Sequence, residues 1–192
     1  MSFRFCDESE YGFGWNAREK LRRTSHALLV DGRVWLTDPV AWPEAEERAR
    51  SLGKPAGVIQ LLDRHNRDCA AVAARLGVPH LRLPEVLPPF EVVRVVDLHR
   101  WRERALWWPE HRLLVVSEAV GTNSFYLARG EHLAVHPLLR LTPPRRLASF
   151  EPDHVIVGHG AGVHDNAAAV LREALRTSRR RVPRWVASHL SR

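Results

Sequence analysis

Apolar runs and turn residues in the first quarter of the chain predict a hairpin followed by a helix. Two apolar runs within Ser25–Thr37 flank Asp31-Gly32, a dipeptide that favours a two-residue hairpin turn. The apolar residues of Pro43–Leu52 fall on one helical face, and Gly53 stands just beyond them. We therefore expect two antiparallel strands and then a short amphipathic helix.

The stretch Gly57–His80 is the centre of the predicted architecture. An apolar run, Val58–Leu62, leads directly into a polar segment, residues 63–69. A helix pattern rich in small residues follows and closes at Gly77. Loops at strand ends place side chains in a shared cleft, while the strand and the helix hold them still. We therefore expect the polar segment to belong to a functional site.

The second half of the chain continues the alternation of strands and loops. Strand composition appears in four runs: Val92–Leu98, Ala105–Trp108, Arg112–Ser117 and Val155–Val157. A helix with an apolar stripe follows Asp165, and a short last helix is predicted at Pro183–His189. Residues 1–25 are polar and irregular. Without a linker or a low-complexity stretch, the pattern predicts one domain over residues 1–192.

Composition agrees with a globular protein, because 45% of the residues are hydrophobic and 27% are charged. No apolar run approaches the roughly 18 residues needed to span a bilayer. The first residues lack the apolar core of a signal peptide. Two cysteines, Cys6 and Cys69, do not make a disulfide framework. We expect a cytoplasmic protein with free thiols and no membrane partner.

The chain is basic, with 29 basic residues, 22 acidic residues and a formal net charge of +7. Only Lys20 and Lys54 are lysine; the other basic residues are arginine. One interpretation is an anionic partner. The other is a set of arginines spread over a solvated surface. The densest basic run is Arg176–Arg184, and Arg179–Arg184 within it predict weak, salt-sensitive binding to polyanions such as nucleic acid, with little sequence specificity.

Four segments, in order along the chain, each carry a strand into a loop with ligand-type side chains. They are the hairpin that ends at Asp38-Pro39, the polar loop Arg64–Cys69, the strand that ends at Glu118, and the strand before Gly158-His159-Gly160. Together they resemble the metallo-β-lactamase-fold superfamily, and within it the hydroxyacylglutathione hydrolases. The resemblance implies an α/β fold: a four-layer αββα sandwich with two mixed sheets between outer helices.

Proteins of this superfamily have two metal sites and a His-x-His-x-Asp-His motif. The first site takes three histidines, two of which come from that motif. In this sequence Arg64 and Asn66 stand at the first two histidines of that degenerate motif. Arginine keeps its proton and cannot bind a cation. The resemblance therefore implies that the first metal site is lost.

The second site, by the same resemblance, retains a full set of potential ligands. They are Asp68, Cys69, Glu118 and His159. Carboxylate, thiolate and imidazole ligands suit zinc, and the nearby helix N-terminus should lower the pKa of Cys69. Alternatively these residues are remnants, with a buried cysteine and carboxylates paired with Arg64 or Arg67. One zinc ion and no metal both remain open. His65, in the same loop, is either a candidate base or an ordinary loop histidine.

Two functions follow from the resemblance. The first is a metal-dependent hydrolase of an ester, thioester or phosphoester, with at most one metal. In it Asp68 or Glu118 orients the attacking water, and Arg64 and Arg67 bind the anionic group of a small substrate. The second is a catalytically inactive binding module for a small anion, a protein or RNA. The metal content of the purified protein distinguishes the two.

Overall fold

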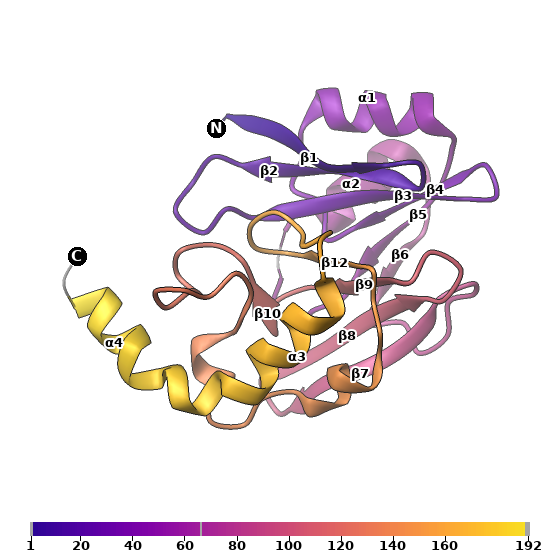
Figure 1. Cartoon of the computed structure of the whole chain (residues 1–192). Helices are drawn as coiled ribbons and strands as arrows, with labels where there is room; N and C mark the ends of the chain where they lie inside the picture. Colours follow the sequence, from indigo (N-terminus) through magenta and orange to yellow (C-terminus); the bar gives the residue numbers. More distant parts are fainter. Residues whose placement is uncertain (1, 66, 191–192) are drawn as a thin grey trace.

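The computed structural model describes residues 2–65 and 67–190. Two β-sheets face each other, and helices cover their outer surfaces (Figure 1). This is the four-layer αββα arrangement that the sequence predicts.

The first sheet contains six strands. In spatial order they are β1 (Phe3–Ser9), β2 (Gly12–Ala17), β3 (Thr24–Val30), β4 (Arg33–Thr37), β5 (Lys54–Gln60) and β6 (His80–Arg82). Strands β1 to β4 are antiparallel, and β5 and β6 continue the sheet in parallel. The turn between β3 and β4 is the predicted one. Asp31 and Gly32 both have positive φ, 49° and 71°, as a two-residue hairpin turn requires.

The second sheet contains four strands. In spatial order they are β12 (His154–Val157), β9 (Leu113–Val116), β8 (Trp101–Trp108) and β7 (Glu91–Leu98). Strand β12 is parallel to β9, so both end at the same edge of the sheet. A small ladder joins β10 (Val120–Gly121) to β11 (Ala134–Val135).

Three helices cover the sheets and one extends toward the C-terminus (Figure 1). They are α1 (Pro43–Leu52), α2 (Cys69–Leu76), α3 (Ala167–Thr177) and α4 (Val182–Leu190). Single 3₁₀ turns lie at Pro137–Leu139, Arg145–Ser149 and Ser178–Arg181. Both α1 and α2 begin and end within one residue of the predicted positions. No helix within the described residues is long and apolar enough to cross a membrane.

Alternation along the strands divides the core into three layers. Along β9, Leu113 and Val115 pack between the two sheets, whereas Leu114 and Val116 pack toward α3. On the other side, α1 and α2 pack on the first sheet through small side chains such as Ala45. Each sheet is thus buried on both faces, which explains the nearly continuous apolar runs in β9 and β12.

Residues 1–25 differ from the prediction of an irregular segment, because they contain β1 and β2. Every residue of β2 is buried, and Trp15 is 1% exposed. Glycines and charged residues interrupt the apolar pattern of these strands, so their local sequence does not predict them. Tertiary packing stabilises these strands where their local strand propensity is weak. Strands β5 and β8 also begin about four residues earlier than predicted, at Lys54 and Trp101.

Candidate metal centre

Three side chains from three strand ends converge at one edge of the sandwich. They are His65, after β5; Glu118, after β9; and His159, after β12. One ligand atom from each lies within 4.8 Å of the other two. Among the described residues, this is the group of histidine, cysteine or carboxylate side chains with the spacing of a metal site.

His159 is held by a backbone carbonyl through one ring nitrogen, and its other nitrogen has no hydrogen-bond partner within residues 2–65 and 67–190. Its Nδ1 lies 3.0 Å from the carbonyl oxygen of Leu21, which only accepts, so Nδ1 carries the proton. Its Nε2 is buried and has no hydrogen-bond partner among the residues described. Burial, and then the nearby charge of Arg67, lower the pKa of His159 to about 3. A neutral imidazole with a buried, unpaired nitrogen is the state that a metal ligand needs.

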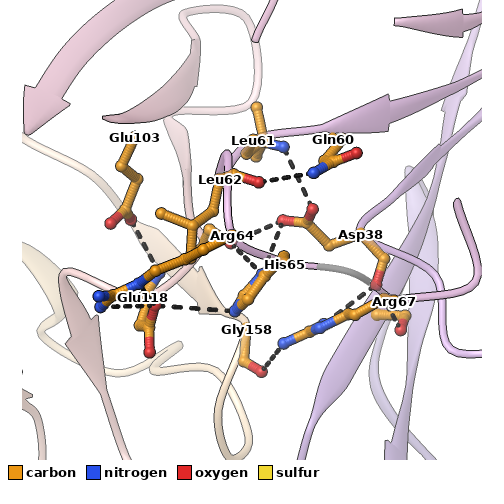
Figure 2. A network of polar contacts seen from close by, with 12 residues as sticks. Asp38, Gln60, Leu61, Leu62, Arg64, His65, Arg67, Glu103, Glu118 and Gly158 are labelled. Carbon is orange, nitrogen blue, oxygen red and sulfur yellow. Dashed lines mark hydrogen bonds and ion pairs between the residues drawn. The ribbon is translucent and has the colours of Figure 1, made fainter. Parts of the chain in front are cut away.

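His65 is also neutral and also fixed through one nitrogen. Its Nδ1 lies 2.9 Å from Oγ of Ser117, and its Nε2 lies 3.9 Å from Oε2 of Glu118 (Figure 2). Burial is the main reason that its pKa lies below the usual histidine value, and the charge of Arg67 adds to this effect. The ring of His65 lies 5.6 Å from the ring of His159, centroid to centroid.

A second carboxyl group, which is buried, holds the backbone at Glu118 in place. Glu103, which is 0% exposed, accepts hydrogen bonds from the backbone amides of Glu118 and Ala119 at 2.8 and 2.9 Å. Its other oxygen accepts from Nε1 of Trp101 at 3.1 Å. Burial raises the pKa of Glu103 to about 7. These bonds fix the turn after β9 from which the side chain of Glu118 projects (Figure 2).

Arg64 forms an ion pair with Glu118 on the solvent-facing side of the site. Its guanidinium donates to Oε2 of Glu118 from Nε and Nη2, each at 3.3 Å. The other carboxylate oxygen lies 3.6 Å from Nε2 of His136, whose pKa burial lowers to about 4. The Arg64 side chain is 38% exposed, so it borders both the site and the solvent.

Arg67, which the sequence analysis predicted to bind substrate, instead forms hydrogen bonds to the protein backbone. Its guanidinium donates to three backbone carbonyls, those of Thr24, Asp38 and Gly158. These bonds connect the loop after β5 to the ends of the strands beside it (Figure 2). The charge of Arg67 reaches the site, but both Nη groups of its guanidinium are engaged by backbone carbonyls.

The other two predicted ligands, Asp68 and Cys69, are not part of the group of three. Asp68 is exposed, and its Oδ2 accepts from the backbone amide of Ala41 at 2.8 Å. Cys69 is 1% exposed and packs between α2 and the first sheet. The expectation of a lowered Cys69 pKa is wrong, because burial raises the pKa of this thiol. Asn66 lies outside the described residues.

Sequence reasoning gave His65 no metal role, because a motif comparison assigns ligands by position along the chain. His65 stands between two motif positions, and only the folded loop turns it toward Glu118. His136 gave no signal in the sequence either, since it lies in a loop far from every motif. The one local clue to His65 was its place in a polar segment directly after a buried strand.

No protein-family model matches the sequence, and no curated protein matches it. Solved structures do share its arrangement. The metallo-β-lactamase from Pontibacter korlensis has a TM-score of 0.65 at 11% identity, covering 91% of this chain and 99% of that chain. DIM-1 metallo-β-lactamase exposed to ceftazidime has a TM-score of 0.57 at 11% identity, covering 93% and 98%. The chemotaxis sensor ODP, in a peroxy diiron form, has a TM-score of 0.60 at 12% identity, covering 92% and 94%. The chain therefore has the metallo-β-lactamase fold.

Proposed function

We propose that this protein is a metal-dependent hydrolase that holds one metal ion per chain between His65, Glu118 and His159. The observation that carries the proposal is Nε2 of His159, a buried acceptor without a described partner. A buried polar atom of this kind costs free energy unless something binds it. Two imidazole nitrogens and one carboxylate oxygen are a ligand set that catalytic zinc uses, with a further position open to water.

A bound metal would polarise the scissile carbonyl or phosphoryl group and lower the pKa of a water molecule beside it. Side chains of the protein would bind and orient the substrate. Arg64, half exposed at the edge of the site, would bind an anionic group of the substrate. Glu118 would exchange its contact with Arg64 for the metal, which leaves the guanidinium free for that anion. An ester, thioester or phosphoester with a nearby negative charge is the substrate class that fits.

A limit of one metal follows from the charges around the site. Arg64 contacts Glu118 directly, and the charge of Arg67 is among the causes that lower the pKa of both His65 and His159. Two guanidinium groups already supply positive charge where a second dication would stand. Glu118 is the carboxylate of the group, and it is shared with Arg64. A second ion would have little negative charge to offset it.

The test is metal stoichiometry after dialysis against zinc and gel filtration. We expect about one equivalent in the wild type and none in His159→Ala. Cys69→Ala is the matched control, because it removes a potential ligand from the core rather than from the site. It should keep the metal and lose only stability. Loss of metal in Cys69→Ala with retention in His159→Ala would contradict the assignment.

Two further outcomes are informative. Two equivalents in the wild type would contradict the single site. No metal in the wild type would favour the inactive binding module, in which the ion pair of Arg64 and Glu118 is the resting state of the site. A panel of esters, thioesters and phosphoesters with and without an anionic group then tests the reaction in the loaded protein.

A further inference from the structure

We infer that Asp38 acts through Ser117 as a positioning residue that holds His65 in its Nδ1–H tautomer. The three side chains form one chain of hydrogen bonds. Oγ of Ser117 lies 2.6 Å from Oδ2 of Asp38 and 2.9 Å from Nδ1 of His65. The direct distance from Nδ1 to Oδ2 is 3.6 Å, which is too long for a hydrogen bond. Ser117 is therefore the link.

The direction of this chain follows from the hydrogen bonds of Asp38. A carboxyl group is normally ionised at neutral pH, and both oxygens of Asp38 accept: Oδ1 from the amide of Leu61 at 3.2 Å, and Oδ2 from Oγ of Ser117 at 2.6 Å, a contact that needs a hydrogen between the two oxygens. Asp38 is therefore a carboxylate and only accepts. The single hydroxyl hydrogen of Ser117 goes to Asp38, so Oγ must accept from His65. Nδ1 of His65 then carries the proton, and Nε2 keeps its lone pair.

Asp38 is itself held rigidly. Its Oδ1 accepts from the backbone amide of Leu61 at 3.2 Å, and its backbone carbonyl accepts from Arg67 at 3.0 Å (Figure 2). The same carbonyl also accepts from Oγ of Ser25 at 3.0 Å. Its φ of 42° lies in the left-handed region that non-glycine residues rarely adopt. Surrounding structure must maintain such a conformation, and residues of this kind cluster at functional sites.

The tautomer of His65 also affects how the metal centre would bind a cation. This effect on metal binding rests on the proposed function, whereas the tautomer itself does not. With the proton fixed on Nδ1, the lone pair of Nε2 lies on the side of Glu118 and His159. His159 has the same tautomer through the Leu21 carbonyl. Both imidazoles thus offer Nε2, and neither must lose a proton before a cation binds.

The substitution Asp38→Asn tests the inference because the surrounding bonds dictate how the amide will lie. The Leu61 amide requires an acceptor at the Oδ1 position, so the amide oxygen must lie there. The new NH₂ group then replaces Oδ2 and donates to Ser117. The hydroxyl of Ser117 turns and donates to Nδ1 of His65, and the imidazole proton moves to Nε2. The variant is nearly isosteric with the wild type, yet it should carry the opposite tautomer.

The readout is ¹⁵N–¹H correlation NMR of the histidine side chains in metal-free protein at pH 7.5, where His65 is neutral. The His65 signals are assigned by their loss in His65→Gln. We expect the Nδ1–H pattern in the wild type and in the control Asp153→Asn, and the Nε2–H pattern in Asp38→Asn. If Asp38→Asn does not fold, Ser117→Ala replaces it, and we then expect loss of the pure Nδ1–H pattern. An Nε2–H pattern in the wild type would overturn the inference, as would an unchanged pattern in the folded variants.

Cobalt binding distinguishes the two proposals. We expect Asp38→Asn to bind Co²⁺ about 10- to 100-fold more weakly than the wild type, the range typical for lost support of a metal ligand. A tautomer change without Co²⁺ binding in any variant would support the positioning role and contradict the proposed function. Equal Co²⁺ affinity despite a changed tautomer would contradict the link between them.

Discussion

The guanidinium carbon of Arg64 lies over the indole ring of Trp101, 3.8 Å from the ring centroid. Trp101 is buried and bonded to Glu103, so it provides a fixed base for a side chain that is itself partly exposed. The stacking holds Arg64 beside Glu118 even when Glu118 takes another partner. In the proposed metal site, Arg64 would therefore compete with the cation for Glu118.

Arg64→Met should strengthen metal binding. The change removes a positive charge 3.3 Å from Oε2 of Glu118 and frees the carboxylate. A half-exposed ion pair contributes roughly 0.2–1 kcal/mol, which corresponds to an affinity gain of about 1.4- to 5-fold. Competition with a chelating dye measures it. Arg102→Met, which removes an exposed arginine next to Asp63, is the control and should leave the affinity unchanged. Weaker binding in Arg64→Met would show that Arg64 supports the site.

Arg67→Met should destabilise the fold. Three backbone carbonyls lose a charged donor, and those of Thr24 and Gly158 lie at the ends of strands from different sheets. The carbonyls of Asp38 and Gly158 each keep one other donor, Oγ of Ser25 and the amide of Thr24. A hydrogen bond from a charged donor contributes about 1.5–3 kcal/mol, and such contributions are not additive, so we expect a loss of about 3 kcal/mol in the free energy of unfolding. Urea denaturation followed by tryptophan fluorescence measures it.

Arg112→Met is the matched control for this experiment. Arg112 pairs with Asp153 at 3.0 Å, but the two side chains are 48% and 59% exposed. An exposed pair contributes less than about 1 kcal/mol. If the two substitutions lower the free energy of unfolding equally, the hydrogen bonds of Arg67 to the backbone contribute no more to stability than an exposed ion pair does.

Asp7→Asn should destabilise the protein at neutral and mildly acidic pH. The Asp7 side chain is 2% exposed and accepts from the Gly162 amide at 2.7 Å and from His164 and His26 at 3.1 Å each. Burial alone would raise the pKa of Asp7, but these hydrogen bonds outweigh it and hold the pKa well below the usual range. Hydrogen bonds to a buried charge contribute about 1.5–3 kcal/mol, and we expect a loss of this size at pH 7.

The pH dependence has a definite sign. A carboxyl group with a depressed pKa stabilises the folded state above its unfolded-state pKa, about 3.9, and this contribution fades as the pH falls below that value. Asp7 also raises the pKa of His164 through their hydrogen bond, so protonation of His164 adds to the contribution of Asp7 below about pH 6.5. The gap between wild type and Asp7→Asn should therefore be widest between about pH 4 and pH 6 and narrow between about pH 4 and pH 2. Urea titrations at several pH values measure the gap. A constant gap across this range would contradict the ionised state of Asp7.

The basic run near the C-terminus should bind polyanions weakly. Arg180 and Arg184 are exposed, on the last 3₁₀ turn and on α4. Release of counterions would drive association, so affinity for a fluorescent single-stranded RNA should fall steeply between about 50 and 200 mM salt. Replacing both arginines by serine should weaken binding at low salt. The same replacement at Arg145 and Arg146, also exposed, is a control of equal charge. Equal effects would mean that net charge alone is responsible.

Local signals predicted the elements that have local causes. Asp31-Gly32 specifies a turn through backbone angles, and Pro43 and Gly53 mark the ends of α1 through the chemistry of helix termini. Glu118 and His159 were predicted from the family resemblance, at positions directly after apolar strands, and both lie in the candidate centre. The strands of residues 1–25 were not predicted, because their stability comes from packing on elements far along the chain.

The composition of the site was harder to predict, because it depends on the direction of each side chain. In residues 63–69 one loop sends His65 toward Glu118, Arg67 toward backbone carbonyls, and Cys69 into the core. Neighbours in sequence thus enter three environments. Spacing specifies which residues share a loop, whereas their directions follow from the strands that surround it.

The hydrogen bond of His159 to the backbone carbonyl of Leu21 affects which mutations the loop between β2 and β3 can accept. Every amino acid supplies a backbone carbonyl, so replacement of Leu21 leaves the acceptor in place, and the same carbonyl also accepts from Asn123. Insertion or deletion of a residue between β2 and β3 would instead move that carbonyl away from the imidazole. This loop should therefore accept many substitutions over evolutionary time while conserving its length.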